Sequence, residues 1–296
     1  MLSDRITDYI HYLRFEKRFS RHTLDSYQKD LEQFRDFALE QFSLDSATNI
    51  SHFHIRSWLA ALKDQKQSPR TINRKLSSLN SFYKFLLRQQ AVEKNPVRQL
   101  HALKLPERLP SYMKEQETQH LLEELQFDEG FKGFTDRLIC ELFYQTGMRR
   151  QELLQLKEAD IEWSLQQVRV LGKGNKERLI PVHPVLLDEL TSYIAEKKIM
   201  GLPDDGHLLV LENGGPLYPV YIYRTVKKYL SIATTLQKKS PHVLRHTFAT
   251  HLLNNGANIQ AIKDLLGHSS LAATQVYTHN NIAKLKEIHK QNHPRG

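Results

Sequence analysis

The sequence predicts a mainly α-helical protein of two domains, the second of which adds a small antiparallel sheet to its helices. Apolar residues recur at helical spacing through residues 1–101. Residues 102–112 then carry two prolines and little periodicity, which predicts a linker. Beyond it, in the domain of residues 113–296, residues 166–182 alternate on both sides of a glycine-rich centre, which predicts a hairpin. A chain of 296 residues is long enough for two cores.

Composition is typical of a soluble globular protein, because 40% of the residues are hydrophobic and 25% are charged. No apolar run approaches the roughly 20 residues that a membrane-spanning helix needs. The N-terminus carries acids early and has no uninterrupted apolar core, so we do not expect a signal peptide. The single cysteine, Cys140, lies in an apolar-periodic segment and is expected to pack in the core, which fits a reducing cytoplasm.

Positive charge is concentrated in the N-terminal third of the chain. The net charge is +9, and residues 1–104 contain 18 Lys and Arg against 11 Asp and Glu. Such an excess raises the odds of a polyanionic partner. On net charge alone, a simple role in solubility explains it about equally well.

The N-terminal domain is predicted to contain capped helices. The clearest runs cover residues 21–42, 52–65 and 70–90. Ser68 followed by Pro69 is a good N-cap and first turn for the last of them. The buried face of the first run is predicted to hold Leu24, Tyr27, Leu31, Phe34 and Leu39.

The helix over residues 70–90 has two contrasting faces. Its buried face is predicted to hold Ile72, Leu76, Leu79, Tyr83 and Leu86. The opposite face carries four cations and two hydroxyls with no acid among them, which suits a phosphate backbone. An ordinary solvated face is the alternative, although acids normally interleave on such faces. The predicted DNA contacts are Arg70, Arg74, Lys84 and Arg88, beside Ser77 and Ser81.

Helical patterns dominate the C-terminal domain on both sides of the hairpin. The hairpin is expected to turn near residues 172–176. The predicted helices cover residues 115–125, 134–147, 185–198, 220–233, 243–256 and 257–267.

Polar side chains of catalytic types occur in four short stretches of otherwise apolar pattern: TGMRRQELLQL, GKGNKER, PHVLRHTFATH and LGHSSLAATQVYTH. Taken singly, each of these side chains has an ordinary explanation, such as an ion pair, a solvated turn or a capped helix end. Taken together, these side chains are better explained by a catalytic role. The candidate residues are Arg149, Lys173, His242, Arg245, His268 and Tyr277.

A metal site is not expected. His242 and His246 have the spacing of zinc-binding helices, but Val243 stands where a metalloprotease carries its glutamate. No cysteine pair or acid cluster offers the remaining ligands. We also expect no cofactor.

The set of residue types suits phosphoryl transfer. Two arginines can hold the non-bridging oxygens of a phosphodiester bidentately, and their charge is permanent. Histidine moves protons near neutral pH, and lysine can protonate a departing alkoxide. A tyrosine, with a pKa of about 10, becomes a nucleophile when cations lower that value and a base takes its proton.

The motifs TGMRRQEL, GKGNKER, HVLRHTFATHL, LGHSSL and VYTH, in this order, resemble the tyrosine recombinase (phage integrase) family, and its Xer-type branch most. SRHTLDSYQKDL and TINRKLSSLNSFYKFL resemble the core-binding domain of that family. The resemblance spans nearly the whole chain. It implies a helical, SAM-like core-binding domain followed by a mixed, mostly helical catalytic domain.

The resemblance also implies a role for each candidate residue. Arg149 and Arg245 would grip the scissile phosphate, and Lys173 would protonate the 5′-hydroxyl that leaves.

On the other side of the phosphorus atom, Tyr277 would attack and form a 3′-phosphotyrosine. His242 would be its acid/base partner, and His268 would donate a further hydrogen bond to the phosphate.

The partners implied by the resemblance are a double-stranded DNA recombination site and further copies of the recombinase. Four protomers would synapse two sites and exchange strands through a Holliday junction, with a paralogous recombinase and a septal DNA translocase as further candidates. A final helix over residues 282–291 would dock into a neighbouring protomer, or onto its own domain.

The expected function is site-specific recombination that resolves chromosome dimers at cell division. An integrase of a mobile element is an alternative, disfavoured because the first helical pattern begins almost at residue 1. A type IB topoisomerase shares the chemistry without synapsis. A DNA-binding regulator that has lost catalysis is the alternative from another class.

Overall fold

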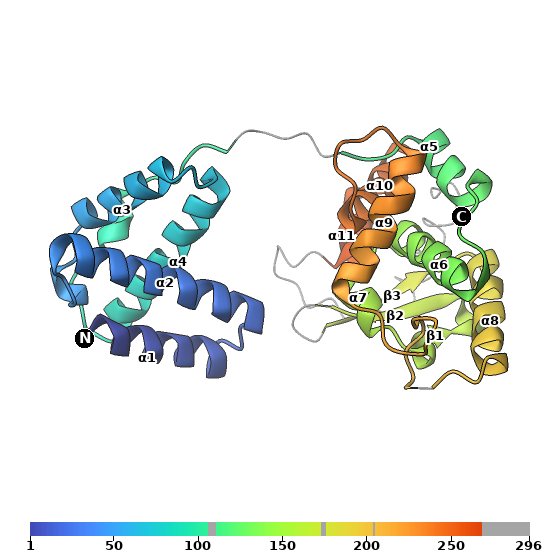
Figure 1. Cartoon of the computed structure of the whole chain (residues 1–296), viewed down its shortest axis with the longest axis horizontal. Helices are drawn as coiled ribbons and strands as arrows, with labels where there is room; N and C mark the ends of the chain where they lie inside the picture. The colour runs from blue at the N-terminus through green and yellow to red at the C-terminus, as the bar shows by residue number, and fades with distance from the viewer. Residues whose placement is uncertain (106–110, 173–175, 204, 268–296) are drawn as a thin grey trace. The chain divides into compact units, whose positions relative to one another are not determined.

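The computed structural model describes residues 1–105, 111–172, 176–203 and 205–267. The chain forms two compact units, Met1–Arg108 and Leu109–Gly296, each with its own hydrophobic core (Figure 1). Among the described residues, no helix has the length and apolar character that crossing a membrane requires.

Helices make up the ordered elements of the first unit. The elements are α1 (Leu2–Phe15), α2 (Arg21–Phe42), the short η1 (Ala47–Asn49), α3 (His52–Asp64), α4 (Pro69–Arg88) and the short η2 (Pro96–Gln99). The sequence placed α2, α3 and α4, the three helices whose bounds were predicted, to within two residues at either end.

Helix α4 shows how local signals and burial agree. The Ser68 hydroxyl accepts a hydrogen bond from the backbone N–H of Thr71, and Pro69 occupies the first turn, so the helix starts where its capping residues stand. Its predicted apolar face is buried along its whole length. The residues of that face are Ile72, Leu76, Leu79, Tyr83 and Leu86.

The prediction for Leu39 was wrong, because its side chain is 50% exposed. The inner face of α2 continues from Phe34 to Ala38, which is fully buried. Five residues of an α-helix turn through about 500°, so Leu39 points roughly 140° away from Phe34. The apolar residue that closes the stripe is the small alanine, not the larger leucine beside it.

The second unit surrounds a small sheet with helices. Strands β1 (Ile161–Glu162), β2 (Gln167–Leu171) and β3 (Glu177–Pro181) are antiparallel in the order β1-β2-β3. The helices are α5 (Glu115–Gln119) continued by the π-helical η3 (His120–Glu124), α6 (Gly130–Thr146), α7 (Arg150–Gln155), α8 (Pro184–Ile199), α9 (Pro219–Ala233), α10 (Pro241–Asn254) and α11 (Ile259–Leu266), with short turns η4 (Glu158–Asp160) and η5 (Trp163–Leu165).

The predicted hairpin is confirmed, but the sheet also contains a third strand that was not predicted. Val168 of β2 pairs with Ile180 of β3, and the N–H of Gly172 donates to the carbonyl of Lys176 at 2.8 Å, at the ends of the expected turn. The sequence missed β1, which has only two residues and no alternation to detect.

Helix α6 lies at the centre of the second core. It contacts α8, α9 and α10 (Figure 1). Nearly every residue in its second half is buried, including Cys140, which confirms the expectation that this thiol is core packing. Such a helix is buried on all sides of its second half, so it fixes the helices that carry the candidate residues.

Truncation of a buried leucine in α4 tests this assignment of faces. Leu79→Ala should lower the free energy of unfolding by about 2–5 kcal/mol, because it removes a fully buried side chain and leaves a cavity. Leu39→Ala is the matched control and should change it by less than about 0.5 kcal/mol. Urea unfolding of the two variants makes the comparison, and equal losses would contradict the assigned faces.

Candidate active site

The end of α6, the start of α7, helix α10 and the end of α11 meet at Gly147. This glycine has a left-handed backbone (φ 58°) and ends α6. A Cβ atom there would lie 2.5 Å from the Phe248 ring of α10 and 2.9 Å from Leu266 of α11. Only glycine therefore lets the turn that leads to Arg149 approach both helices.

Arg245 is buried between the ends of two helices. It is 8% exposed, and its guanidinium donates to the carbonyl of Gly147 and, at 2.7 Å, to the carbonyl of Leu266. Burial, together with the charges of Arg149 and Arg178, lowers the pKa of Arg245 to about 10. The side chain is still a cation near neutral pH.

Arg149 caps the start of α7 and is held from two sides. Its Nη1 donates to Glu152 at 2.8 Å, and its backbone N–H donates to the other oxygen of the same carboxylate at 2.7 Å. Its Nη2 donates to the carbonyl of Gly267 at 2.8 Å. Roughly a third of the side chain is exposed, so a residue held in place by these contacts still reaches solvent.

Sequence analysis assigned neither Glu152 nor Arg178 to the site, although an ion pair with an acid such as Glu152 was one ordinary explanation for Arg149. Both side chains are 4% exposed, and they form a bidentate ion pair with distances of 2.9 and 2.7 Å. Two signals could have found them. Glu152 has the capping-box spacing after Arg149, and Arg178 shares with Ile180 the buried face of β3, where a cation requires an acid.

The Glu152 carboxylate stays ionised although it is buried. Burial by itself raises its pKa, but the hydrogen bonds and charge of Arg178 and the contacts from Arg149 outweigh burial and bring the pKa to about 2. A buried acid with such a low pKa acts as a permanent anion at neutral pH.

His242 stands in the first turn of α10 near the arginines. Its pKa is lowered by burial and then by the charges of Arg245, Arg150 and Arg149. The imidazole is therefore neutral near pH 7 and able to accept a proton. His246, one turn further along α10, has its pKa lowered by burial alone.

The structure brings together three of the six predicted catalytic residues, Arg149, His242 and Arg245. The other three, Lys173, His268 and Tyr277, lie outside the described residues, as does the predicted final helix over residues 282–291.

Two glycines next to these undescribed residues do lie at the site. Gly172, which precedes Lys173 in the chain, and Gly267, which precedes His268, both approach the guanidinium of Arg178.

The α4 face that we assigned to DNA is exposed, but some of its cations are engaged in contacts with neighbouring helices. Arg70 and Lys84 are exposed to solvent. Arg88 donates to the hydroxyl of Tyr12 at 2.6 Å and lies over the Tyr12 ring.

The fourth cation of that face, Arg74, pairs with Asp30 of α2. Asp30 is 1% exposed and also accepts from the buried Lys75 at 2.9 Å. The cationic face of α4 therefore includes an ion pair with an acid. The sequence of α4 alone could not reveal this acid, because Asp30 belongs to the neighbouring helix α2.

Among the described residues, no group of three or more His, Cys, Asp and Glu side chains is placed to hold a metal ion. In the described part of the site, the guanidiniums of Arg149, Arg178 and Arg245 lie around the carboxylate of Glu152. Such an arrangement is suited to an anion with several oxygens, such as a phosphate.

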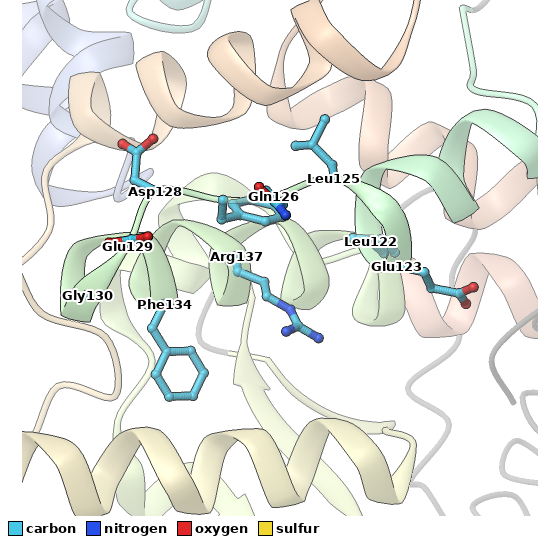
Figure 2. Close-up of a pocket in the computed structure, with 11 residues that line it drawn as sticks. Leu122, Glu123, Leu125, Gln126, Asp128, Glu129, Gly130, Phe134 and Arg137 are labelled. Carbon is cyan, nitrogen blue, oxygen red and sulfur yellow. The ribbon is translucent and has the colours of Figure 1, made fainter.

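A separate open pocket of about 730 Å³ lies between η3 and the start of α6 (Figure 2). Its lining includes the acids Glu123, Asp128 and Glu129 beside apolar side chains. These three acids outnumber the lining cation Arg137, whose guanidinium pairs with Glu189 at 2.5 Å, so this pocket does not favour an anionic substrate. The arginine cluster is the better candidate for an anionic substrate.

Comparison with known proteins gives matches over both units. Residues 111–284 match the phage integrase family, and residues 6–90 match its N-terminal SAM-like domain. The chain is 38% identical to tyrosine recombinase XerC of Halalkalibacterium halodurans, over 98% of this chain and 97% of that protein. It is 33% identical to tyrosine recombinase XerD of the same organism, over 99% of each.

Solved structures agree in fold. The XerH site-specific recombinase in a post-cleavage complex with its palindromic difH substrate has a TM-score of 0.73 at 22% identity, covering 96% of this chain and 83% of that one. A λ integrase dimer bound to a COC′ core site has a TM-score of 0.66 at 18% identity, covering 93% and 98%. This confirms the predicted fold class.

The charges around His242 can be tested by titration. Arg150→Gln removes a neighbouring cation that disfavours the imidazolium, so the pKa of His242 should rise from its lowered value toward 6.5. The pKa of His246 is the internal control and should not move, because burial alone lowers it. NMR titration of histidine-labelled protein measures both, and parallel shifts would contradict the electrostatic origin.

Proposed function

The chain belongs to the phage integrase family, and we propose that it is a site-specific tyrosine recombinase that cuts and rejoins DNA with the arginine cluster at the start of α7 and α10. The observation that carries the proposal is the fixed pair of Arg149 and Arg245. Each is held by hydrogen bonds to backbone carbonyls at the end of α11, and Arg245 also to the end of α6, so both are in place before substrate arrives.

In the proposed reaction the two guanidiniums bind the non-bridging oxygens of the scissile phosphate. Negative charge grows on those oxygens as phosphorus becomes five-coordinate, and cations already in position stabilise it without further rearrangement. The low exposure of Arg245 strengthens this interaction, because little water competes for the guanidinium.

The nucleophile is the phenol oxygen of Tyr277. It forms a bond to phosphorus while the bond to the 5′-oxygen breaks, which leaves a 3′-phosphotyrosine and a free 5′-hydroxyl. His242 takes the phenol proton, a role that its lowered pKa favours because the ring is neutral at pH 7.

Lys173 gives a proton to the departing 5′-oxygen, and His268 donates to the phosphate. Reversal of the same steps with a different 5′-hydroxyl joins the exchanged strand. The energy of the broken phosphodiester is kept in the phosphotyrosine, so the cycle needs neither ATP nor a metal ion.

The biological role that we propose is resolution of chromosome dimers in the cytoplasm of a dividing cell, with four protomers on two synapsed sites. A paralogous partner is supported by the relatives, since one bacterium carries both a XerC and a XerD that this chain resembles. Activation by a septal DNA translocase, and docking of the helix over residues 282–291 on a neighbouring protomer, belong to the same proposal.

Replacement of Tyr277 by phenylalanine tests the chemistry. DNA that remains attached to wild-type protein after denaturation identifies the site by sequencing, and a nicked suicide substrate is then built on it. Tyr277→Phe should bind this substrate with unchanged affinity and give no covalent complex on a denaturing gel, because the attacking oxygen is gone.

Any trapped complex in the Tyr277→Phe variant would refute the nucleophile. Cleavage by wild-type protein that disappears in chelator would refute metal independence. Relaxation of plasmids without exchange between two distinguishable ones would favour a topoisomerase.

Removal of exposed cations from α4 tests the proposed DNA face. The double variant Arg70→Gln/Lys84→Gln should bind duplex DNA more weakly and reduce the slope of log Kd against log salt concentration by about 0.9 for each lost phosphate contact. Anisotropy titrations at several salt concentrations measure the slope. Arg35→Gln on α2, whose side chain pairs with Asp36, is the control, and a double variant that matched it would show that the α4 face points to water.

A further inference from the structure

We infer that Arg178 is a positioning residue of the active site, which holds Arg149 through Glu152 and fixes the two chain segments that lead to Lys173 and His268. The inference rests on the proposed function, because its measurable consequence is the rate of DNA cleavage.

The first observation is the set of contacts that the guanidinium of Arg178 makes. Nη1 and Nη2 donate to the two oxygens of Glu152 at 2.9 and 2.7 Å, and Nε donates to the carbonyl of Leu265 at 2.7 Å. Arg178 itself is 4% exposed. Strand β3 and helices α7 and α11 are therefore joined by one buried side chain.

The second observation is the use of Glu152 by two arginines at once. Its Oε1 accepts from Nη1 of Arg149 and of Arg178, while its Oε2 accepts from the Arg149 backbone N–H and from Nη2 of Arg178. Burial raises the pKa of this carboxyl, and the hydrogen bonds and charge of Arg178 are the largest effects that oppose it. The bidentate contact with Arg178 also orients both carboxylate oxygens, and those oxygens in turn hold Arg149.

The third observation is the close packing of two glycines against the same guanidinium. A Cβ atom on Gly267 would lie 3.3 Å from Nη1 of Arg178, and one on Gly172 would lie 3.4 Å from that atom. At Gly267 this approach is tighter than an ordinary Cβ contact and the backbone is left-handed (φ 62°), so the position favours glycine, whereas the 3.4 Å at Gly172 is an ordinary van der Waals contact. Arg178 thus packs against the chain one residue before Lys173 and one residue before His268.

A lysine cannot reproduce these contacts, although it keeps the charge. Its ammonium has no planar fork to match both carboxylate oxygens and no Nε to reach the Leu265 carbonyl. Arg178→Lys should therefore preserve the fold better than a neutral residue, while it lets Arg149 drift. A misplacement of about 1 Å typically slows an enzyme roughly a hundredfold.

The test compares single-turnover formation of the covalent complex on two suicide substrates of the same sequence. One carries the natural phosphate at the cleavage position, and the other carries a methylphosphonate, in which a methyl group replaces one anionic oxygen. The neutral substrate has less charge for Arg149 to stabilise. If the defect acts through Arg149, the ratio of wild-type to variant rate must therefore be smaller on the methylphosphonate than on the phosphate. A loss of folded protein instead slows the reaction equally on both substrates.

We expect Arg178→Lys to be slower than wild type by roughly a hundredfold on the phosphate, with a clearly smaller ratio on the methylphosphonate and unchanged DNA affinity. Arg149→Lys is the reference variant, and its rate defect should likewise be smaller on the methylphosphonate than on the phosphate. Arg169→Lys is the matched control, since Arg169 lies on the neighbouring strand β2 beside the partly exposed Asp160. It should retain the wild-type rate on both substrates.

A second variant guards against misfolding. Glu152→Gln/Arg178→Met removes both members of the buried pair, and the cation that loses its carboxylate partner, Arg149, is partly exposed to solvent. Its melting temperature is measured first, and its rate on the phosphate should remain as slow as that of Arg178→Lys. A wild-type rate in this double variant would show that the pair serves stability alone and would overturn the inference.

Two other results would also overturn it: a wild-type rate for Arg178→Lys, or equal slowing on the two substrates. Failure of the proposed function has a different signature, because wild-type protein would then form no covalent complex on either substrate.

Discussion

The carboxylate of Glu152 is the point on which the catalytic unit depends. It is buried, so it is stable only as long as cations surround it, and Arg178 and Arg149 both meet that need. The pair with Arg178 is internal to the fold, whereas the pair with Arg149 ends at the surface. The need of the buried Glu152 carboxylate for cations thereby fixes the direction of the partly exposed Arg149 side chain.

The same arrangement occurs in the N-terminal unit. Asp30 is buried and pairs with Lys75, which is also buried, and with Arg74, whose side chain is 43% exposed. In each unit a buried acid pairs with a buried cation and with an arginine that is at least partly exposed. A long flexible side chain loses entropy when it binds a phosphate, and an arginine already held by a carboxylate has lost part of that entropy on folding.

The arginines that are held in place in the second unit also repel one another. Arg149, Arg178 and Arg245 lie around a single carboxylate, and the lowered pKa of Arg245 reports the burial and the mutual repulsion of the cations. A phosphate between Arg149 and Arg245 would relieve that repulsion, and more so as its charge grows during phosphoryl transfer. Burial and then the charges of the neighbouring arginines lower the pKa of His242 beside them.

Much of this protein follows from its sequence alone. Periodicity and caps located the helices, alternation located the hairpin, and the order of motifs with Arg149, His242, Arg245 and Tyr277 indicated the family, because these signals are local or depend only on spacing. Tertiary structure decided the rest. It turned Leu39 outward, brought Asp30 to Arg74, and buried the pair of Arg178 and Glu152, which are 26 positions apart in the chain. A charge in a sequence does not show whether it will be solvated or buried, since that depends on which distant segment packs over it.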